Sequence, residues 1–169
     1  MDLLDDWALQ AQVLATTAYA MLLGGAIGFE RELKNRPAGF RTHMLVAGAC
    51  AMLVGLVDLI AERYSDGAYR DFLRIDPIRL IEAAVAAVGF LGAGTIFRGN
   101  EGGLVSGITT AASLLMVAVI GIAAGMHYYV LALAATALTL LVLAGLKLVE
   151  RRMDERRKAR DEKRPDDPG

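Results

Sequence analysis

Acidic and basic side chains lie close together at the end of the first long apolar segment: Glu30, Arg31, Glu32, Arg41 and His43. Charged side chains beside a long apolar helix normally extend toward water, so a solvated arrangement is one interpretation. In the other, Glu30 or Glu32 pairs with Arg41, and the charges close this end of the helices or contact a partner. The second interpretation predicts a functional cluster rather than a solvated surface.

A second polar group consists of Arg98, Ser106, Thr109 and Thr110. Ser106 and Thr109 are suitable N-caps for the next apolar helix, because a hydroxyl oxygen can accept from free backbone N–H groups. Capping explains these residues by itself. The alternative is a hydroxyl-lined site at a helix N-terminus, which would favour an anion.

Acidic residues also lie near or within the apolar segments: Asp58, Asp76 and Glu82. An acid in lipid is costly and often functional. Because Mg²⁺ prefers oxygen ligands, these three acids could form a site for such a cation, although placement at the membrane interface is the simpler interpretation. Arg79, three residues before Glu82, offers that acid a partner on the same helix.

We expect no catalytic activity from this sequence. It has no H-E-x-x-H, G-x-S-x-G or Walker motif, and its two histidines, His43 and His127, are expected on opposite sides of the membrane. The single cysteine, Cys50, cannot form an intrachain disulfide. No cofactor is expected beyond the Mg²⁺ considered above.

The elements that must position these side chains are membrane helices. Hydrophobic residues make up 55% of the 169 residues, and no charged residue occurs in Trp7–Phe29 or in Gly102–Leu146. A helix crosses the bilayer core with about 20 apolar residues. The pattern therefore predicts an all-α polytopic membrane protein with about five spans, at residues 7–29, 43–61, 77–97, 109–125 and 128–149.

Local signals support these boundaries and divide the chain into two parts. Asp76 followed by Pro77 is typical of a helix start, and Gly125–Tyr129 is the expected break within the longest apolar run. We assign residues 1–149 to a transmembrane domain and 150–169 to a charged cytoplasmic tail. The tail is basic enough to contact anionic headgroups, and nucleic-acid binding is not expected.

Basic residues predict the orientation of the helices. With the N-terminus outside, the cytoplasmic segments hold 14 Lys and Arg residues and the outer segments hold 4. The positive-inside rule therefore favours an outer N-terminus and a cytoplasmic C-terminus.

Glycine is concentrated in the predicted helices, and small residues let membrane helices approach closely. The positions expected at helix contacts are Gly24, Gly28, Gly89, Gly92, Gly94 and Gly107. The alternative for residues 89–94 is a broken helix that lines a polar cavity. A shift of 68 residues places Gly24 on Gly92 and Thr42 on Thr110, as a parallel repeat of helices 1–2 and 3–4 would do.

Several motifs together resemble the MgtC/SapB family. The first signature is matched by Gly25–Glu32 with Ala38–His43, the second by Asp76–Arg79 with Gly89–Gly94, and the third by Gly107–Ser113. The resemblance covers about 120 residues and implies the same five-helix plan. Many members carry a small ACT-like domain after the fifth helix, and this sequence resembles a member with the membrane domain only.

The resemblance implies a protein of the bacterial inner membrane that supports growth at low magnesium, in a family linked to virulence. The leading expectation is a regulator of membrane energetics or ion homeostasis that acts through a membrane partner such as the F-type ATP synthase, or as a homo-oligomer. The alternative is a magnesium transporter or channel. The functional cluster is then expected at the inner face and consists of Glu30, Arg31, Glu32, Arg41, Thr42, His43, Arg98, Thr109 and Thr110.

Overall fold

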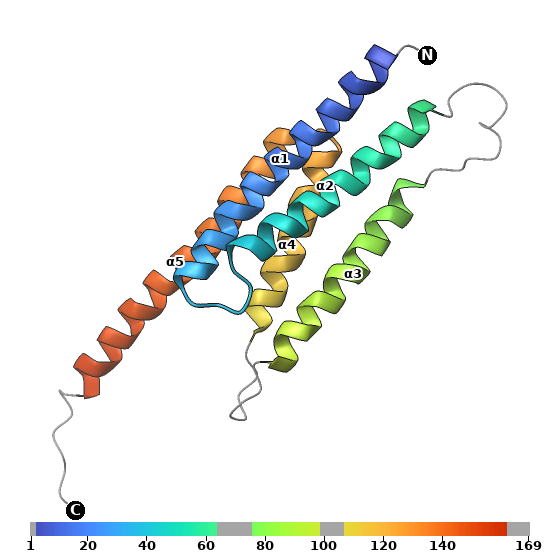
Figure 1. The fold of residues 1–169 in the computed structure, drawn as a ribbon. Coiled ribbons are helices and arrows are strands. Elements are labelled where there is room, and N and C mark those ends of the chain that lie inside the picture. The colour runs from blue at the N-terminus through green and yellow to red at the C-terminus, as the bar shows by residue number, and fades with distance from the viewer. Residues whose placement is uncertain (1–2, 64–75, 99–106, 162–169) are drawn as a thin grey trace, which may run out of the picture.

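The computed structural model describes the backbone of residues 3–63, 76–98 and 107–161, and the side chains of residues 7–63, 76–96 and 107–145. These ranges contain five α-helices and no strand (Figure 1). In chain order the helices are α1 (Leu3–Leu33), α2 (Phe40–Arg63), α3 (Pro77–Arg98), α4 (Ile108–Gly125) and α5 (Tyr129–Asp161). The predicted all-α polytopic fold is confirmed.

Four helices are long and apolar enough to cross a membrane: Trp7–Leu33, Phe40–Arg63, Pro77–Ile96 and Ile108–Gly125. The apolar part of α5 that the structure describes, Tyr129–Gly145, is shorter than these spans. The helix itself continues to Asp161, so the first part of the charged tail assigned to residues 150–169 extends the last helix.

The starts of α3 and α4 differ in their chemistry. The Asp76 carboxylate accepts a hydrogen bond of 3.0 Å from the backbone N–H of Ile78, which confirms the predicted start of α3. Before α4, Gly107 has a φ of +91° and no side-chain cap is present. Thr109 is therefore not the N-cap, and that prediction is wrong, because Gly107 occupies the N-cap position in a left-handed conformation that suits glycine. Ser106 lies outside the described residues.

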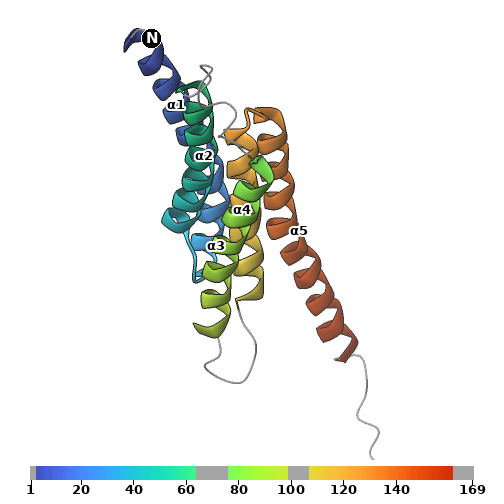
Figure 2. The same cartoon turned by 90° about the vertical axis from the view of Figure 1, so that its right-hand side faces the viewer.

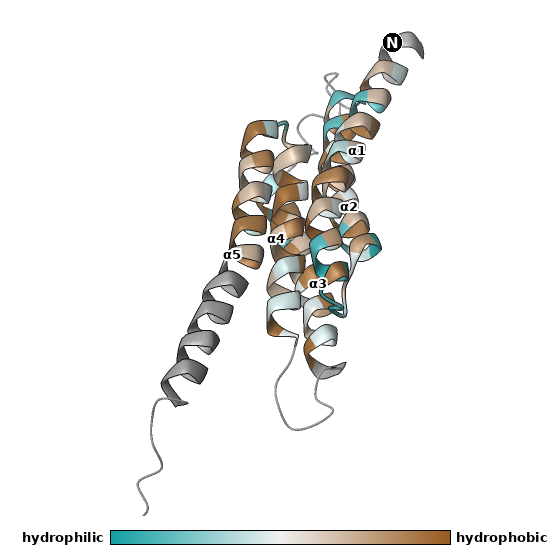
Figure 3. Ribbon diagram, turned by 90° about the vertical axis from the view of Figure 1, so that its left-hand side faces the viewer, coloured by the Kyte–Doolittle hydropathy of each residue, from teal (hydrophilic) through white to brown (hydrophobic). Residues whose placement is uncertain are grey.

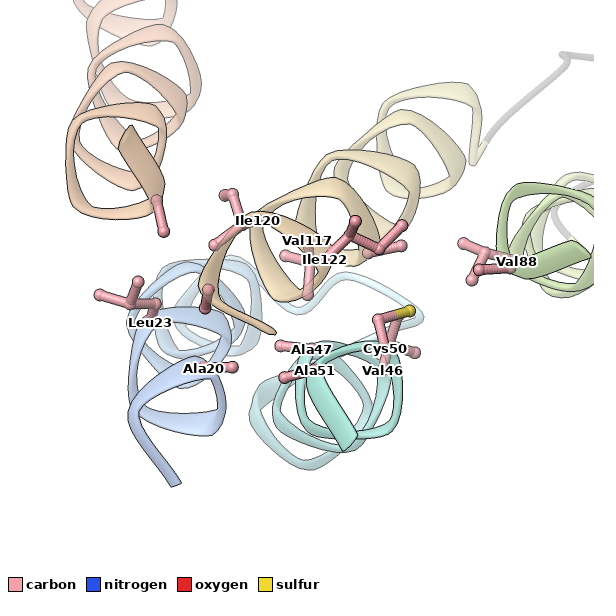
Figure 4. Packing of buried hydrophobic residues seen from close by; sticks show 14 of the residues in the cluster. Ala20, Leu23, Val46, Ala47, Cys50, Ala51, Val88, Val117, Ile120 and Ile122 are labelled. Atoms are coloured by element: carbon pink, nitrogen blue, oxygen red, sulfur yellow. The ribbon is translucent and has the colours of Figure 1, made fainter. Parts of the chain in front are cut away.

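The central helix is α4, which packs against α1, α2, α3 and α5. Figure 2 shows it between the α1–α2 hairpin and α5, with α3 lying across it. Its side chains meet those of α1 and α2 in a core of mostly small residues (Figure 4), which includes Ala20, Leu23, Ala47, Cys50, Ala51, Val117 and Ile120. Figure 3 shows the apolar residues along α4 and α5 and hydrophilic residues at the α1–α2 turn.

Glycine brings α1 against α2. A Cβ atom added to Gly24 would lie 2.6 Å from the carbonyl oxygen of His43, and one added to Gly28 would lie 2.8 Å from the His43 Cβ. A larger residue at either position would push the helices apart. Gly92 has a similar place between α3 and α4, since its added Cβ would lie 3.1 Å from the Cβ of Ala111.

The contacts of Gly24 and Gly92 support the internal repeat. Gly92 follows Gly24 by 68 positions, and Ala111 follows His43 by the same number. Equivalent residues of the two hairpins therefore form equivalent helix contacts. This agreement is stronger than the match of residue types in the sequence, because it involves both members of each contact.

Two of the predicted glycine contacts are absent. Added Cβ atoms at Gly89 and Gly94 would meet no atom within 4 Å in the structure, and α3 is continuous from Pro77 to Arg98. Within 89–94, Gly89 and Gly94 therefore make no tight contact with the described residues, and the helix is not broken there. Gly89 and Gly94 lie on the exposed side of the helix, whereas its other face, with Val88 and Gly92, is buried.

Candidate functional site: a buried polar cluster

Arg31 points into the helix bundle instead of toward the interface. It lies in the last turn of α1, and only 3% of its surface is exposed. Its Nη2 atom donates to the hydroxyl of Thr110, in the first turn of α4, over 3.4 Å. A buried guanidinium needs such partners, because removing a charge from water is costly. The contact joins helices that are distant in the sequence.

Glu30 and Lys34 extend this contact toward α5. Lys34 forms an ion pair with Glu30 one helical turn earlier, and its Nζ donates to the carbonyl oxygen of Leu143 over 2.7 Å. Glu30 Oε2 also lies 4.0 Å from Nη1 of Arg31. Within the described residues, Glu30 Oε2 and Arg31 Nε are buried without a hydrogen-bond partner, so the cluster holds charge that the protein neutralises mainly by ion pairing.

His43 forms the second link to the same turn of α4. Its ring is fully buried, with Nδ1 2.9 Å from the carbonyl oxygen of Gly39 and Nε2 3.1 Å from the hydroxyl of Ser113. A carbonyl oxygen only accepts, so Nδ1 carries a proton. The Ser113 hydroxyl also lies 2.8 Å from the carbonyl oxygen of Thr110. In a neutral imidazole Nε2 accepts, and the single hydroxyl proton of Ser113 then has two acceptors.

These contacts bring α1, α2, α4 and α5 together at one end of the bundle, beside the α1–α2 turn (Figure 1). Arg31 and His43 come from α1 and α2, and both bind the Thr110–Ser113 turn of α4. We call Glu30, Arg31, Lys34, His43, Thr110 and Ser113 the polar cluster. Its geometry can hold helices in register and respond to changes in charge, since each member depends on a charged or polar neighbour.

Glu32, Arg41 and Thr42 lie outside the polar cluster, on the exposed surface. Glu32 Oε2 accepts from the backbone N–H of Phe40 over 2.8 Å, which satisfies a free donor at the start of α2. Neither Glu30 nor Glu32 forms an ion pair with Arg41. The predicted pair is therefore wrong: Glu30 pairs with Lys34, and Glu32 accepts from the backbone N–H of Phe40.

The remaining predicted residues of this end are more scattered. Thr109 is exposed and lines a cavity of about 280 Å³ between α4 and α5. The side chain of Arg98 lies outside the described residues. Of the hydroxyl-lined group predicted around the start of α4, Thr110 is the described residue that joins the polar cluster.

The three acids predicted to bind a metal do not converge. In the described ranges no group of three or more His, Cys, Asp or Glu side chains could hold a metal ion. Asp76 caps α3 and pairs with Arg79 over 3.7 Å, so Arg79 does not pair with Glu82 as expected. Glu82 is exposed, and Asp58 lines a separate cavity. The predicted metal site is wrong for these residues.

Sequence reasoning missed Lys34 and Ser113. The spacing of Lys34, four residues after Glu30, is a signal that could have identified the ion pair. Ser113 lies in the third family-like motif, but its contact with His43 spans 70 positions and depends on how α2 packs on α4.

Comparison with known proteins shows which family the chain resembles. A model of the MgtC family matches residues 17–152. The chain is 35% identical to SapB of Bacillus subtilis (strain 168) over 147 residues, which cover 87% of this chain and 62% of SapB. It is 40% identical to MgtC of Brucella abortus (strain 2308) over 119 residues, which cover 70% of this chain and 44% of that protein.

A further relative is YhiD of Escherichia coli (strain K12), whose name proposes magnesium transport; it is 35% identical over 79% of this chain and 60% of YhiD. The chain thus spans less than two thirds of the length of these relatives. No solved structure matches it. The family model covers most of the chain, including all of the polar cluster, and the chain therefore belongs to the MgtC family.

Proposed function

We propose that this protein regulates membrane energetics or ion homeostasis under magnesium limitation by contacting another membrane protein, such as the F-type ATP synthase. In this proposal it resides in the bacterial inner membrane with its N-terminus outside and its C-terminus in the cytoplasm. The observation that carries the proposal is that charged residues at the α1–α2 turn are of two kinds, some buried and some exposed. Buried charges hold the helices together, while Arg36 and Arg41 are exposed.

The exposed arginines suit an acidic segment of a partner. No ion pair within the described residues involves Arg36 or Arg41. Arg36 lies in the short turn between α1 and α2, and Arg41 lies at the start of α2. Complementary charge at such a surface gives specificity and speeds association. The polar cluster beneath would keep the turn in a fixed position relative to α4.

Close packing inside the bundle favours regulation over conduction. Ala20, Ala47, Ala51 and Val117 are almost fully buried between α1, α2 and α4. A Cβ added to Gly121 would overlap the backbone of Ala47. An ion path between these helices would require them to separate. Magnesium transport is the second candidate, favoured by the name of the relative YhiD.

The decisive experiment compares growth with ion flux. In a strain whose growth at low magnesium depends on this protein, Arg36→Glu combined with Arg41→Glu should abolish growth and lower co-purification with the ATP synthase, although the protein still folds. Arg63→Glu, at the other end of α2 and also exposed, is the matched control and should grow normally. Normal growth of the double variant would contradict the proposed contact.

Flux measurements test the alternative directly. Purified protein in liposomes should carry no magnesium above the level of empty liposomes. Robust flux that Asp58→Asn abolishes would replace the regulator with a transporter.

Cysteine labelling tests the orientation. Arg31 and Thr110 meet at one end of the bundle, whereas Gln12 contacts His127 at the other. In a Cys50→Ala background, Asn35→Cys should react only from the cytoplasm and Tyr128→Cys only from outside. The reverse pattern would overturn the proposed topology.

A further inference from the structure

A cavity of about 200 Å³ lies at the end of the bundle opposite the polar cluster. It is enclosed by α2, α3 and the turn between α4 and α5. Its walls are mostly apolar, with one carboxylate and one imidazole: Val54, Val57, Asp58, Pro77, Leu80, Ile81, Ile122, Met126 and His127. Pockets for drug-sized ligands measure about 300–1,000 Å³, so this cavity suits a smaller molecule.

Asp58 is the charged group of this cavity. Its side chain is half-buried, and it makes no ion pair with any of the described residues. A carboxylate that is partly removed from water and has no counter-charge among the described residues favours a cation beside it. Asp76, at the start of α3, differs in this respect because it already pairs with Arg79.

His127 adds an imidazole ring to the rim of the cavity. The amide nitrogen of Gln12 lies 3.1 Å from its Nε2. An amide nitrogen can only donate, so this contact fits the tautomer of His127 that carries its proton on Nδ1 and accepts at Nε2. In that tautomer the ring does not repel a cation at Asp58. The bond to Gln12 also fixes the α4–α5 turn against α1, which keeps the rim of the cavity in place.

We propose that this cavity binds a small organic cation, a primary ammonium on a short apolar body. The ammonium would pair with Asp58, and the apolar body would contact side chains such as Leu80, Ile81 and Ile122. The lining fits Mg²⁺ poorly, because that ion requires several oxygen ligands or retained waters in octahedral geometry. Here a single carboxylate and one imidazole are surrounded by aliphatic groups and the thioether of Met126.

The test uses n-butylammonium as the probe and the purified full-length protein in nanodiscs. Isothermal titration should detect saturable binding of n-butylammonium, and 1-butanol at the same concentration should bind at least about tenfold more weakly, since it lacks the charge. Mg²⁺ at equal concentration should not displace the probe. Equal binding of 1-butanol, absence of saturable binding, or displacement by Mg²⁺ would overturn the proposal.

Substitutions locate the binding site. Asp58→Asn keeps the shape of the side chain and should weaken n-butylammonium binding about tenfold to hundredfold. Glu82→Gln is the matched control, because Glu82 is exposed and does not line the cavity; it should bind within about twofold of the wild type. Loss of binding in both variants, or in neither, would refute the assignment to Asp58. If Asp58→Asn does not fold, Ile81→Phe, which narrows the cavity, should abolish binding in a folded protein, and unchanged binding would refute the site.

Discussion

The guanidinium of Arg31 and the hydroxyl of Thr110 lie 3.4 Å apart across 79 positions of the sequence. Arg31 lies in the last turn of α1 and Thr110 in the first turn of α4. The contact therefore joins the first hairpin to the central helix at one end of the bundle. Because Arg31 is buried, the bond is made away from water, where hydrogen bonding to a charge contributes most. The relationship makes Arg31 a structural centre of the polar cluster.

Replacing Arg31 should therefore destabilise the protein. Arg31→Met retains much of the apolar stem but removes the donor to Thr110 and the counter-charge of Glu30. We expect a loss of about 1.5–3 kcal/mol in the free energy of unfolding, as for hydrogen bonds to charged groups. Reversible unfolding in mixed detergent micelles would measure it. Arg36→Met, an exposed arginine of the same turn, should stay within about 0.5 kcal/mol of the wild type; equal losses in both variants would contradict the role of Arg31.

His43 and Ser113 should be energetically coupled. A double-mutant cycle with His43→Ala and Ser113→Ala should give an interaction energy of about 0.5–3 kcal/mol, because the two side chains share a buried hydrogen bond. A second cycle of His43→Ala with Thr136→Ala is the control. The Thr136 hydroxyl is also buried but donates to Ala132 of its own helix, so the effects of this pair should add within about 0.3–0.5 kcal/mol. Additive effects in the first cycle would mean that the His43–Ser113 bond contributes nothing.

The helices could be predicted because the residues that determine where each helix begins and ends are close together in the sequence. The apolar runs, the Asp76–Pro77 start and the break before Tyr129 each depend on neighbouring residues, and all three appear in the structure. The start of α4 was predicted to within one residue, but its N-cap was not, for a local reason as well. A left-handed Gly107 competes with hydroxyl capping, and residue type alone does not decide between them.

The site was predictable only in part, because its contacts depend on helix packing. The sequence indicates that Glu30, Arg31, His43 and Thr110 lie near one end, and they do. It does not indicate the rotation of α1 about its axis, which turns Arg31 inward while Glu32 stays exposed. The assumed Glu30–Arg41 pair failed for the same reason, since proximity in a hairpin does not determine which carboxylate faces which cation.

Adding a methyl group to Gly24 should separate α1 from α2. In Gly24→Ala the new Cβ would lie 2.6 Å from the His43 carbonyl oxygen and 2.7 Å from the Ala47 Cβ, too close without a backbone shift. Overpacking of this kind costs about 1–3 kcal/mol. Gly89→Ala is the matched substitution, because its Cβ would meet nothing within 4 Å; it should be neutral or stabilising by up to about 1 kcal/mol.

Thermal unfolding in the same detergent would compare the two glycine variants. A lower melting temperature for Gly89→Ala than for Gly24→Ala would contradict the packing. It would also indicate that the exposed side of α3 is covered by another chain in the assembled protein.

Glu32 should act as a cap for α2 and not as a partner of Arg41. Its carboxylate accepts from the Phe40 N–H over 2.8 Å, at a helix start that has no acidic residue in its own first turn. Glu32→Ala should cost about 0.5–2 kcal/mol, the usual loss for an N-terminal cap. Glu32→Gln should recover most of that stability, because the amide oxygen still accepts. Arg41→Ala should change the unfolding free energy by less than about 0.5 kcal/mol. Chemical unfolding of the three variants distinguishes an ion pair from a cap. If Glu32 paired with Arg41, Glu32→Gln and Arg41→Ala would destabilise the protein equally. If Glu32 caps α2, only Glu32→Ala destabilises it.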